Sequence, residues 1–231
     1  MAIRPFLAMT AAEIHNHPQI PDRIGWMACH FSPYSLGLAN RPKALPAGSL
    51  LILNDVIPVC GHEPEVVAAQ LLEGVDAFSC FGILLDFQRP HSLETERMAA
   101  FLSEALPCPL AVSEPYADNL TCPVFLSPLP LHLPLKEHTV PWKGREIWLE
   151  LAMDAEEILL TEAGAAVTPL PCTINETGHQ DNTLHCHYRI ELTEDAARFT
   201  LWRTKEDIDS LLEEAKGLGI TAAVGLYQEF S

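Results

Sequence analysis

Residues 81–90 read Phe-Gly-Ile-Leu-Leu-Asp-Phe-Gln-Arg-Pro, and this stretch decides the fold. Because side chains alternate along a strand, Leu84, Asp86 and Gln88 share one face. Ile83, Leu85 and Phe87 share the opposite face, and an apolar face of this kind is expected for a parallel strand covered by helices. Leu84 would then fill the interior of a barrel. Asp86 and Gln88 would stand nearer the carboxyl-terminal mouth, where barrel enzymes keep their chemistry.

The rest of the chain supplies further strands and helices of the same kind. Three helical patterns cover residues 63–74, 92–106 and 204–217, and Thr204 with Asp207 resembles a capping box. A segment at 199–203, counted as an eighth strand, brings the total to the number that closes a barrel. The other seven are apolar runs of strand length at 24–31, 49–56, 81–87, 109–113, 123–127, 147–152 and 219–226.

These patterns predict an α/β fold, a reduced (β/α)8 barrel of the TIM type. The helices are too few for a full outer ring, so some connections should be short or irregular. Alternating residues near 184–203 predict an inserted antiparallel hairpin. The barrel domain would span residues 1–231, with 1–22 as an N-terminal extension. An open three-layer α/β sheet is the structural alternative, although the chain has no G-x-G-x-x-G or P-loop motif, and we expect no cofactor.

Composition narrows the classes of partner. The chain has 14 Lys and Arg against 31 Asp and Glu, a formal charge of −17, which disfavours nucleic acid and anionic membranes as partners. Its apolar runs are far shorter than the roughly 20 residues of a membrane helix, and the first ten residues do not read as a secretory signal. We therefore expect a cytoplasmic protein. The seven Cys are scattered without C-x-x-C spacing and read as free thiols.

The stretch 81–90 resembles the signature strand of the family 18 glycoside hydrolases, the chitinase family, D-G-x-D-x-D-x-E followed by an aromatic residue and Pro. A second similarity is the order of elements near the C-terminus, where an acidic loop, a helix ending in Gly-Leu-Gly and a last strand follow a hairpin. Of the signature, Gly82, Asp86 and Pro90 are kept, whereas Phe81 and Leu84 replace two Asp and Gln88 replaces the Glu.

The resemblance implies a pocket and, at the same time, a lost reaction. In the family the Glu is the general acid, and an Asp orients the N-acetyl group of the substrate, which acts as the nucleophile. Asp86 matches the family at an Asp position, but Gln88 has no proton to give at ordinary pH. Some members with such a replacement are catalytically silent and lectin-like. The resemblance therefore implies a barrel that binds a glycan or another small polar ligand.

Further candidates follow other strands to the same mouth. Glu114 and Tyr116 follow the run at 109–113, and His30 lies at the end of the run at 24–31. Tyr227 lies near the place where the family's last strand carries a sugar-stacking Trp. Glu150 is another carboxylate that could face Asp86, and two facing carboxylates would permit a different acid/base arrangement.

His185 and His187 could lie on one side of a strand, a geometry used by metal sites. Spacing suggests no third ligand, so a structural role is favoured and we expect no metal.

Three functional hypotheses remain. The leading one is glycan or small polar ligand binding by a catalytically degenerate barrel, with Asp86, Gln88, Glu114 and Tyr116 in the pocket and His30 and Tyr227 beside it. The second is an active glycoside hydrolase in which Asp86 works with another mouth carboxylate such as Glu114. The third is a protein-interaction scaffold. Carboxyl groups about 5–9.5 Å apart across an open cleft would favour hydrolysis.

Overall fold

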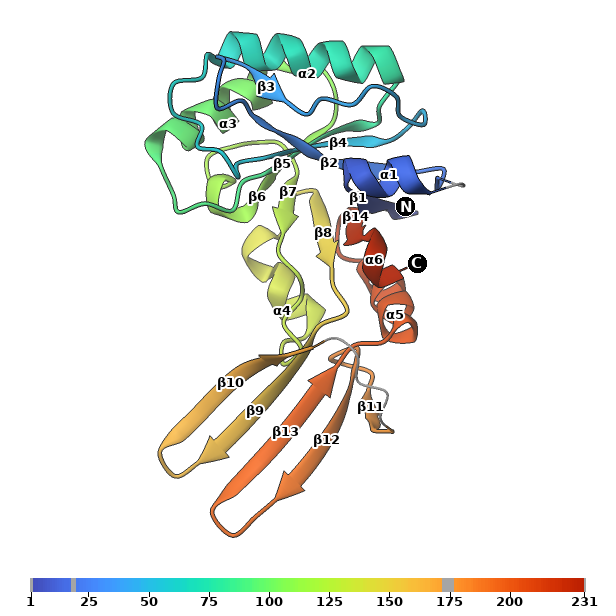
Figure 1. The fold of residues 1–231 in the computed structure, drawn as a ribbon. Helices are drawn as coiled ribbons and strands as arrows, with labels where there is room; N and C mark the ends of the chain where they lie inside the picture. Colours follow the sequence, from blue (N-terminus) through green and yellow to red (C-terminus); the bar gives the residue numbers. More distant parts are fainter. Residues whose placement is uncertain (1, 18–19, 172–176, 231) are drawn as a thin grey trace.

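The computed structural model describes residues 2–17, 20–171 and 177–230, and its main body is a closed barrel of parallel strands (Figure 1). Each strand pairs in parallel with its two neighbours, and pairing of the first strand with the second and the last closes the ring. In order around the barrel, the eight strands are β1 (Arg4–Met9), β2 (Ile24–Phe31), β4 (Leu50–Asn54), β5 (Gly82–Asp86), β6 (Leu110–Ser113), β7 (Val124–Leu126), β8 (Ile147–Leu151) and β14 (Ile220–Leu226).

The core has two layers, one inside the barrel and one between the barrel and its helices. Leu84 of β5 lies inside, packed with Phe6 and Trp148 in a fully buried cluster. Ile83 and Leu85 face outward into the larger cluster under the helices. The alternation predicted for residues 81–90 is therefore confirmed, and it carries Asp86 toward the carboxyl ends of the strands.

Two expectations about the barrel strands are corrected. Residues 4–9, which we expected within an N-terminal extension, form β1, because Phe6 and Ala8 point into the barrel interior. The segment 199–203 is not a barrel strand. It belongs to β13 (Ala196–Trp202), which pairs antiparallel with strands outside the barrel.

Three helices cover the barrel where the sequence predicted them, namely α2 (Pro64–Phe78), α3 (Leu93–Ala105) and α5 (Lys205–Ala215). Thr204 caps α5 in a complete capping box with Asp207. The outer ring is incomplete, as predicted, since β2 and β4 are joined only through the two-residue strand β3 (Leu38–Ala39). The remaining helices are short: α1 (Ala11–Asn16), α4 (Leu135–Thr139), α6 (Tyr227–Phe230) and the 3-10 turns η1 (Glu114–Tyr116) and η2 (Val140–Trp142).

An antiparallel sheet is inserted between β8 and α5, and its hairpins extend away from the barrel (Figure 1). The predicted hairpin is present as two of its strands, but the insertion is larger than expected and has five. Their order across the sheet is β10 (Gly164–Leu170), β9 (Ala155–Thr161), β13, β12 (Cys186–Leu192) and β11 (His179–Asp181).

Buried polar contacts fasten this sheet to the barrel. Arg203 is 4% exposed, and its guanidinium donates to His185 O at 3.0 Å and to Leu129 O at 2.9 Å. The ring of His185 lies 2.7 Å from Glu214 Oε2, and His187 Nδ1 donates to Asp207 Oδ2 at 2.8 Å. Both imidazoles therefore contact acidic residues of α5.

The described residues contain no cluster of three or more His, Cys, Asp or Glu side chains that could hold a metal ion. None of their helices has the length and apolar character needed to cross a bilayer.

Candidate functional site

Asp86 and Gln88 lie at the carboxyl-terminal mouth of the barrel, where two cavities meet. One cavity, of about 360 Å³, extends toward β6, β7 and β8. The other, of about 600 Å³, extends toward β2 and β4. Both residues line both cavities, so they stand at the centre of an elongated hollow. The first cavity also has Glu114, Phe125, Ser127 and Glu150 in its wall, and the second has His30, Asn40, Asn54 and Asp55.

The backbone that carries Gln88 is held by the neighbouring strands on both sides. Asp55, which is 3% exposed, accepts the Gln88 N–H at 2.9 Å and the Arg89 N–H at 3.1 Å. On the other side Ser113 Oγ accepts the Phe87 N–H at 2.9 Å and donates to the Leu85 carbonyl at 3.0 Å. Buried donors and acceptors paired in this way fix the loop after β5, so the side chains at its start are preorganised.

The Gln88 side chain turns back onto Asp86. Its Nε2 donates to Asp86 Oδ1 at 2.9 Å. Burial raises the pKa of Asp86, the Gln88 hydrogen bond lowers it and the charge of Asp55 raises it again, with a net upward shift. Gln88 therefore presents an amide that donates to Asp86 and cannot release a proton at ordinary pH.

Glu150 on β8 is the second carboxyl group at the centre of the site. Burial is the main cause that raises its pKa to about 7, and the charges of Asp86, Asp154 and Glu229 raise it further. Its carboxyl group forms no hydrogen bond or ion pair with any residue that the structure describes. It shares the first cavity with Asp86. A half-buried, unpaired carboxyl group with a pKa near neutrality is suited to donating or accepting a proton.

The sequence contains a signal that singles out Glu150. Trp148 lies two residues before it on β8 and points into the barrel interior. Glu150 therefore faces the same way and stands nearer the mouth, just as Asp86 does two residues after Leu84. By the same alternation of side chains, applied to β8 as it was to β5, Glu150 is a stronger candidate than Glu114 for a carboxylate that faces the mouth.

Glu114 and His30 line the hollow as wall residues, each with a partner. Glu114 Oε1 accepts the Trp142 Nε1–H at 3.2 Å. His30 lies in the second cavity, with Nδ1 2.8 Å from the Phe31 carbonyl oxygen and Nε2 3.0 Å from Asn40 Nδ2. Each adds a polar group to the wall of the hollow, but its side chain already contacts other polar groups of the protein.

The two tyrosines of the sequence prediction lie outside the walls of these two cavities. Tyr116 is 4% exposed, and its hydroxyl donates to the Arg89 carbonyl at 3.4 Å, which supports the loop after β5 from below. Tyr227 begins α6, where its hydroxyl lies 3.2 Å from His17 Nδ1 and its ring packs edge-on against that imidazole.

Solved structures share this architecture at very low sequence identity. The spore cortex-lytic enzyme SleL of Bacillus cereus is 9% identical, with a TM-score of 0.61 over 99% of this chain and 71% of that one. A GH18 chitinase of Cycas revoluta, in complex with (GlcNAc)4, is 9% identical, with a TM-score of 0.62 over 96% of this chain and 94% of that one. The class V chitinase of Nicotiana tobaccum is 9% identical, with a TM-score of 0.59 over 100% and 95%.

At the level of sequence, no family model and no curated protein matches the chain. Identities of 9% with TM-scores near 0.6 establish a common fold and leave the activity to be argued from the site. The chain therefore has the TIM-barrel fold of the family 18 chitinases.

Proposed function

We propose that the chain binds an oligosaccharide at the barrel mouth, across Asp86 and Gln88, and does not hydrolyse it by the usual route of family 18. The observation that carries this proposal is the hydrogen bond from Gln88 Nε2 to Asp86 Oδ1. The resemblance assigns the general acid to the position of Gln88 and the carboxylate that orients the N-acetyl group to Asp86, and this bond joins those two side chains. Binding groups are therefore kept while the proton donor is lost.

The shape and lining of the hollow support an elongated, polar ligand. Two cavities extend from the Asp86–Gln88 centre in opposite directions around the mouth. Their walls contain carboxylates and amides, which bond sugar hydroxyls. The Cycas revoluta chitinase bound to (GlcNAc)4 is a double mutant, and one of its exchanges is Glu to Gln. In that protein, a Glu-to-Gln exchange is compatible with a bound oligosaccharide.

A second function, glycoside hydrolysis through a different acid, is favoured by Glu150. Its pKa of about 7 keeps a proton available near neutral pH, and Asp86 lines the same cavity. Glu150 would protonate the leaving oxygen as the C–O bond breaks, and its carboxylate would then take a proton from the attacking water. Glu114 suits this role less well because its carboxylate already accepts the Trp142 N–H.

A thermal-shift screen with chitin-type and peptidoglycan fragments tests the binding proposal. The wild type should be stabilised by at least one class of fragment, and Asp86→Ala should abolish that shift. Asp76→Ala, an exposed carboxylate on α2, is the matched control and should keep it. A shift of unchanged size in Asp86→Ala would refute the site. Chromatography of the fragments after incubation separates the two functions, because only the hydrolase shortens them, and Glu150→Gln should then stop the cleavage.

A further inference from the structure

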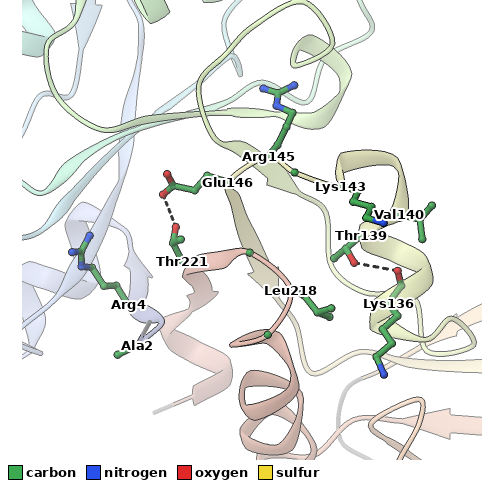
Figure 2. Close-up of a pocket in the computed structure, with 13 residues that line it drawn as sticks. Ala2, Arg4, Lys136, Thr139, Val140, Lys143, Arg145, Glu146, Leu218 and Thr221 are labelled. Atoms are coloured by element: carbon green, nitrogen blue, oxygen red, sulfur yellow. Dashed lines mark hydrogen bonds between the residues drawn. The ribbon is translucent and has the colours of Figure 1, made fainter.

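A second large hollow lies at the opposite, amino-terminal end of the barrel. Its volume is about 740 Å³, and it is formed where β1, β8 and β14 begin and where α5 turns into β14 (Figure 2). Leu84 and Trp148, both fully buried, fill the barrel interior between this end and the mouth. The two hollows are therefore separate, and an occupant of one does not reach Asp86 in the other.

Cationic side chains gather around this hollow in an otherwise acidic protein. The chain has only 14 Lys and Arg against 31 Asp and Glu, yet Arg4, Lys136, Lys143 and Arg145 all line this one cavity. The guanidinium of Arg145 serves the fold, since it donates to the Ala117 carbonyl at 2.8 Å and also to Cys122 O. Three cationic groups remain for a ligand.

These three cations have little compensation from the protein. Arg4 stacks on the Phe81 ring, with its guanidinium carbon 4.4 Å from the ring centre. Lys136 Nζ is 4.0 Å from Glu214 Oε1, at the outer limit of an ion pair, and Lys143 forms no ion pair within the described residues. Like charges held near one another repel, so an anion placed among them is stabilised.

The one carboxylate in the wall, Glu146, keeps its negative charge, but it is held by neutral donors and forms no ion pair with the three cations within the described residues. Glu146 Oε1 accepts hydrogen bonds from Thr221 Oγ1 at 2.6 Å and from Trp148 Nε1 at 3.4 Å. Figure 2 shows Glu146 and Thr221 turned toward each other, with Arg4 on one side of the hollow and Lys136 and Lys143 on the other. The side chain of Leu218 lies between the two sides and adds an apolar patch to the wall.

We propose that this hollow binds a small molecule that carries two separated anionic groups, one held by Arg4 and the other by Lys136 and Lys143. Cations on two sides of the hollow select a ligand with charge at both ends over a single small anion. Phosphate and carboxylate groups both suit Arg and Lys donors.

The charge of the whole molecule favours a small ligand over a polymer. Screening limits electrostatic interactions to about 8 Å at physiological ionic strength, so a small dianion inside the hollow interacts mainly with the cations that line it. A nucleic acid or a long acidic chain would extend over the remaining surface, where the formal charge of −17 repels it.

Isothermal titration with fructose 1,6-bisphosphate, and separately with inorganic phosphate, tests this proposal on the full chain. The bisphosphate should bind the wild type more tightly than phosphate. Arg4→Gln and Lys143→Gln should each weaken bisphosphate binding by about fivefold, the upper end for one partly exposed charge pair. Arg97→Gln, an exposed cation on α3, and Asp86→Ala should bind it as the wild type does.

Two results would overturn the proposal. One is a wild type that binds neither probe, and the other is an equal loss of affinity in Lys143→Gln and Arg97→Gln, which would indicate only a general effect of net charge. Lys143→Gln keeps the test decisive even if Arg4→Gln disturbs the stacking on Phe81, because the Lys143 side chain is exposed. A protein that binds no oligosaccharide at the mouth should still bind the bisphosphate at this hollow. The two proposals can therefore be refuted independently of each other.

Discussion

Gln88 Nε2 and Asp86 Oδ1 lie 2.9 Å apart and form a hydrogen bond across the centre of the barrel mouth. With an amide as donor, the bond does not depend on a proton that Gln88 could lose. Asp86 is thereby held in one orientation between two cavities. In the family 18 signature that this strand resembles, a Glu at the position of Gln88 donates a proton. Here the Gln88 amide would instead fix Asp86 as an acceptor for a ligand.

Replacing Gln88 by Glu should give the chain a proton donor. Two carboxyl groups at this distance cannot both ionise easily, so one of them keeps a proton near neutral pH. We expect Gln88→Glu to cleave N-acetylglucosamine oligosaccharides, with a gain of about 10²-fold or more over Gln88→Ala, the range typical of general acid catalysis. Cleavage is measured by chromatography of the products. A Gln88→Glu variant that binds the oligosaccharide and leaves it intact would show that more than the proton donor is missing.

The raised pKa of Glu150 should make the protein less stable as pH rises. Its carboxyl group keeps a proton up to about pH 7 in the folded state, compared with a usual pKa of 4.5, so folding takes up a proton between these values. Stability therefore falls from about pH 4.5 to 7. Glu150→Gln avoids this loss and should be more stable than the wild type at pH 8, by about 1–3 kcal/mol.

Urea unfolding at pH 5 and pH 8 measures this difference. The gain from Glu150→Gln should be small at pH 5 and full at pH 8. The exposed Glu137→Gln on α4 is the matched control, and it should gain nothing comparable. A gain of equal size at both pH values would mean that titration of Glu150 is not its cause.

Asp207 should be the most sensitive contact between the inserted sheet and the barrel. Its buried carboxylate accepts from Thr204 N at 2.9 Å, from His187 Nδ1 at 2.8 Å and from Gln180 Nε2 at 3.2 Å. Burial alone raises its pKa, but these hydrogen bonds and the charge of His187 outweigh burial, and the net pKa is lowered. Asp207→Asn should cost about 2–3 kcal/mol at pH 7, because a neutral amide replaces the buried charged acceptor of these hydrogen bonds.

Because the pKa of Asp207 is lowered on folding, its stabilisation is present at neutral pH and is lost as pH falls through the folded-state value. The gap between the wild type and Asp207→Asn should therefore narrow in acid, as measured by denaturant unfolding. Asp209→Asn, exposed on the same helix, serves as the control. If both substitutions cost the same at pH 7, the contact does not stabilise the sheet.

Gly82 should be intolerant of any side chain. A Cβ atom on Gly82 would lie 2.3 Å from the carbonyl oxygen of Pro109, so the start of β5 or the segment before β6 would have to shift. Gly82→Ala should destabilise the protein by about 1–3 kcal/mol, as overpacking in a close-packed core does. Gly217→Ala, whose Cβ would lie at an ordinary 3.7 Å from Glu214 O, is the control in thermal unfolding. An equal loss in both variants would contradict the close approach.

The barrel was predictable from the sequence where local chemistry and tertiary packing agree. The alternation of β5 places Leu84 inside and Asp86 at the mouth, and the capping residues of α5 mark its start. Strand β1 was missed because its apolar stretch is short and starts with Arg4 and Pro5, both exposed at the amino-terminal end. Three strands of the inserted sheet, β9, β10 and β11, were missed because most of their residues are exposed or only half-buried.

The site was predictable in its position and less so in its chemistry. Asp86 and Gln88 follow from strand periodicity alone. The pKa of Glu150 does not, since it depends mainly on burial and then on the charges of Asp86, Asp154 and Glu229, and both Asp86 and Glu229 are distant from Glu150 in the sequence. Tyr116 and Tyr227 follow strands that point to the mouth, but neither side chain lines the two cavities. Tyr116 contacts the loop after β5, and Tyr227 contacts His17. Such partners are set by tertiary packing.

The most direct test of the account is a calorimetric titration of the wild type and Asp86→Ala with the N-acetylglucosamine tetramer, followed by chromatography of the ligand. We expect the wild type to bind the tetramer and leave it intact. Asp86→Ala, folded as judged by its thermal unfolding, should bind it at least about tenfold more weakly, the loss expected for a charged acceptor. Equal affinity in the two proteins, or a shortened tetramer after incubation with the wild type, would contradict it.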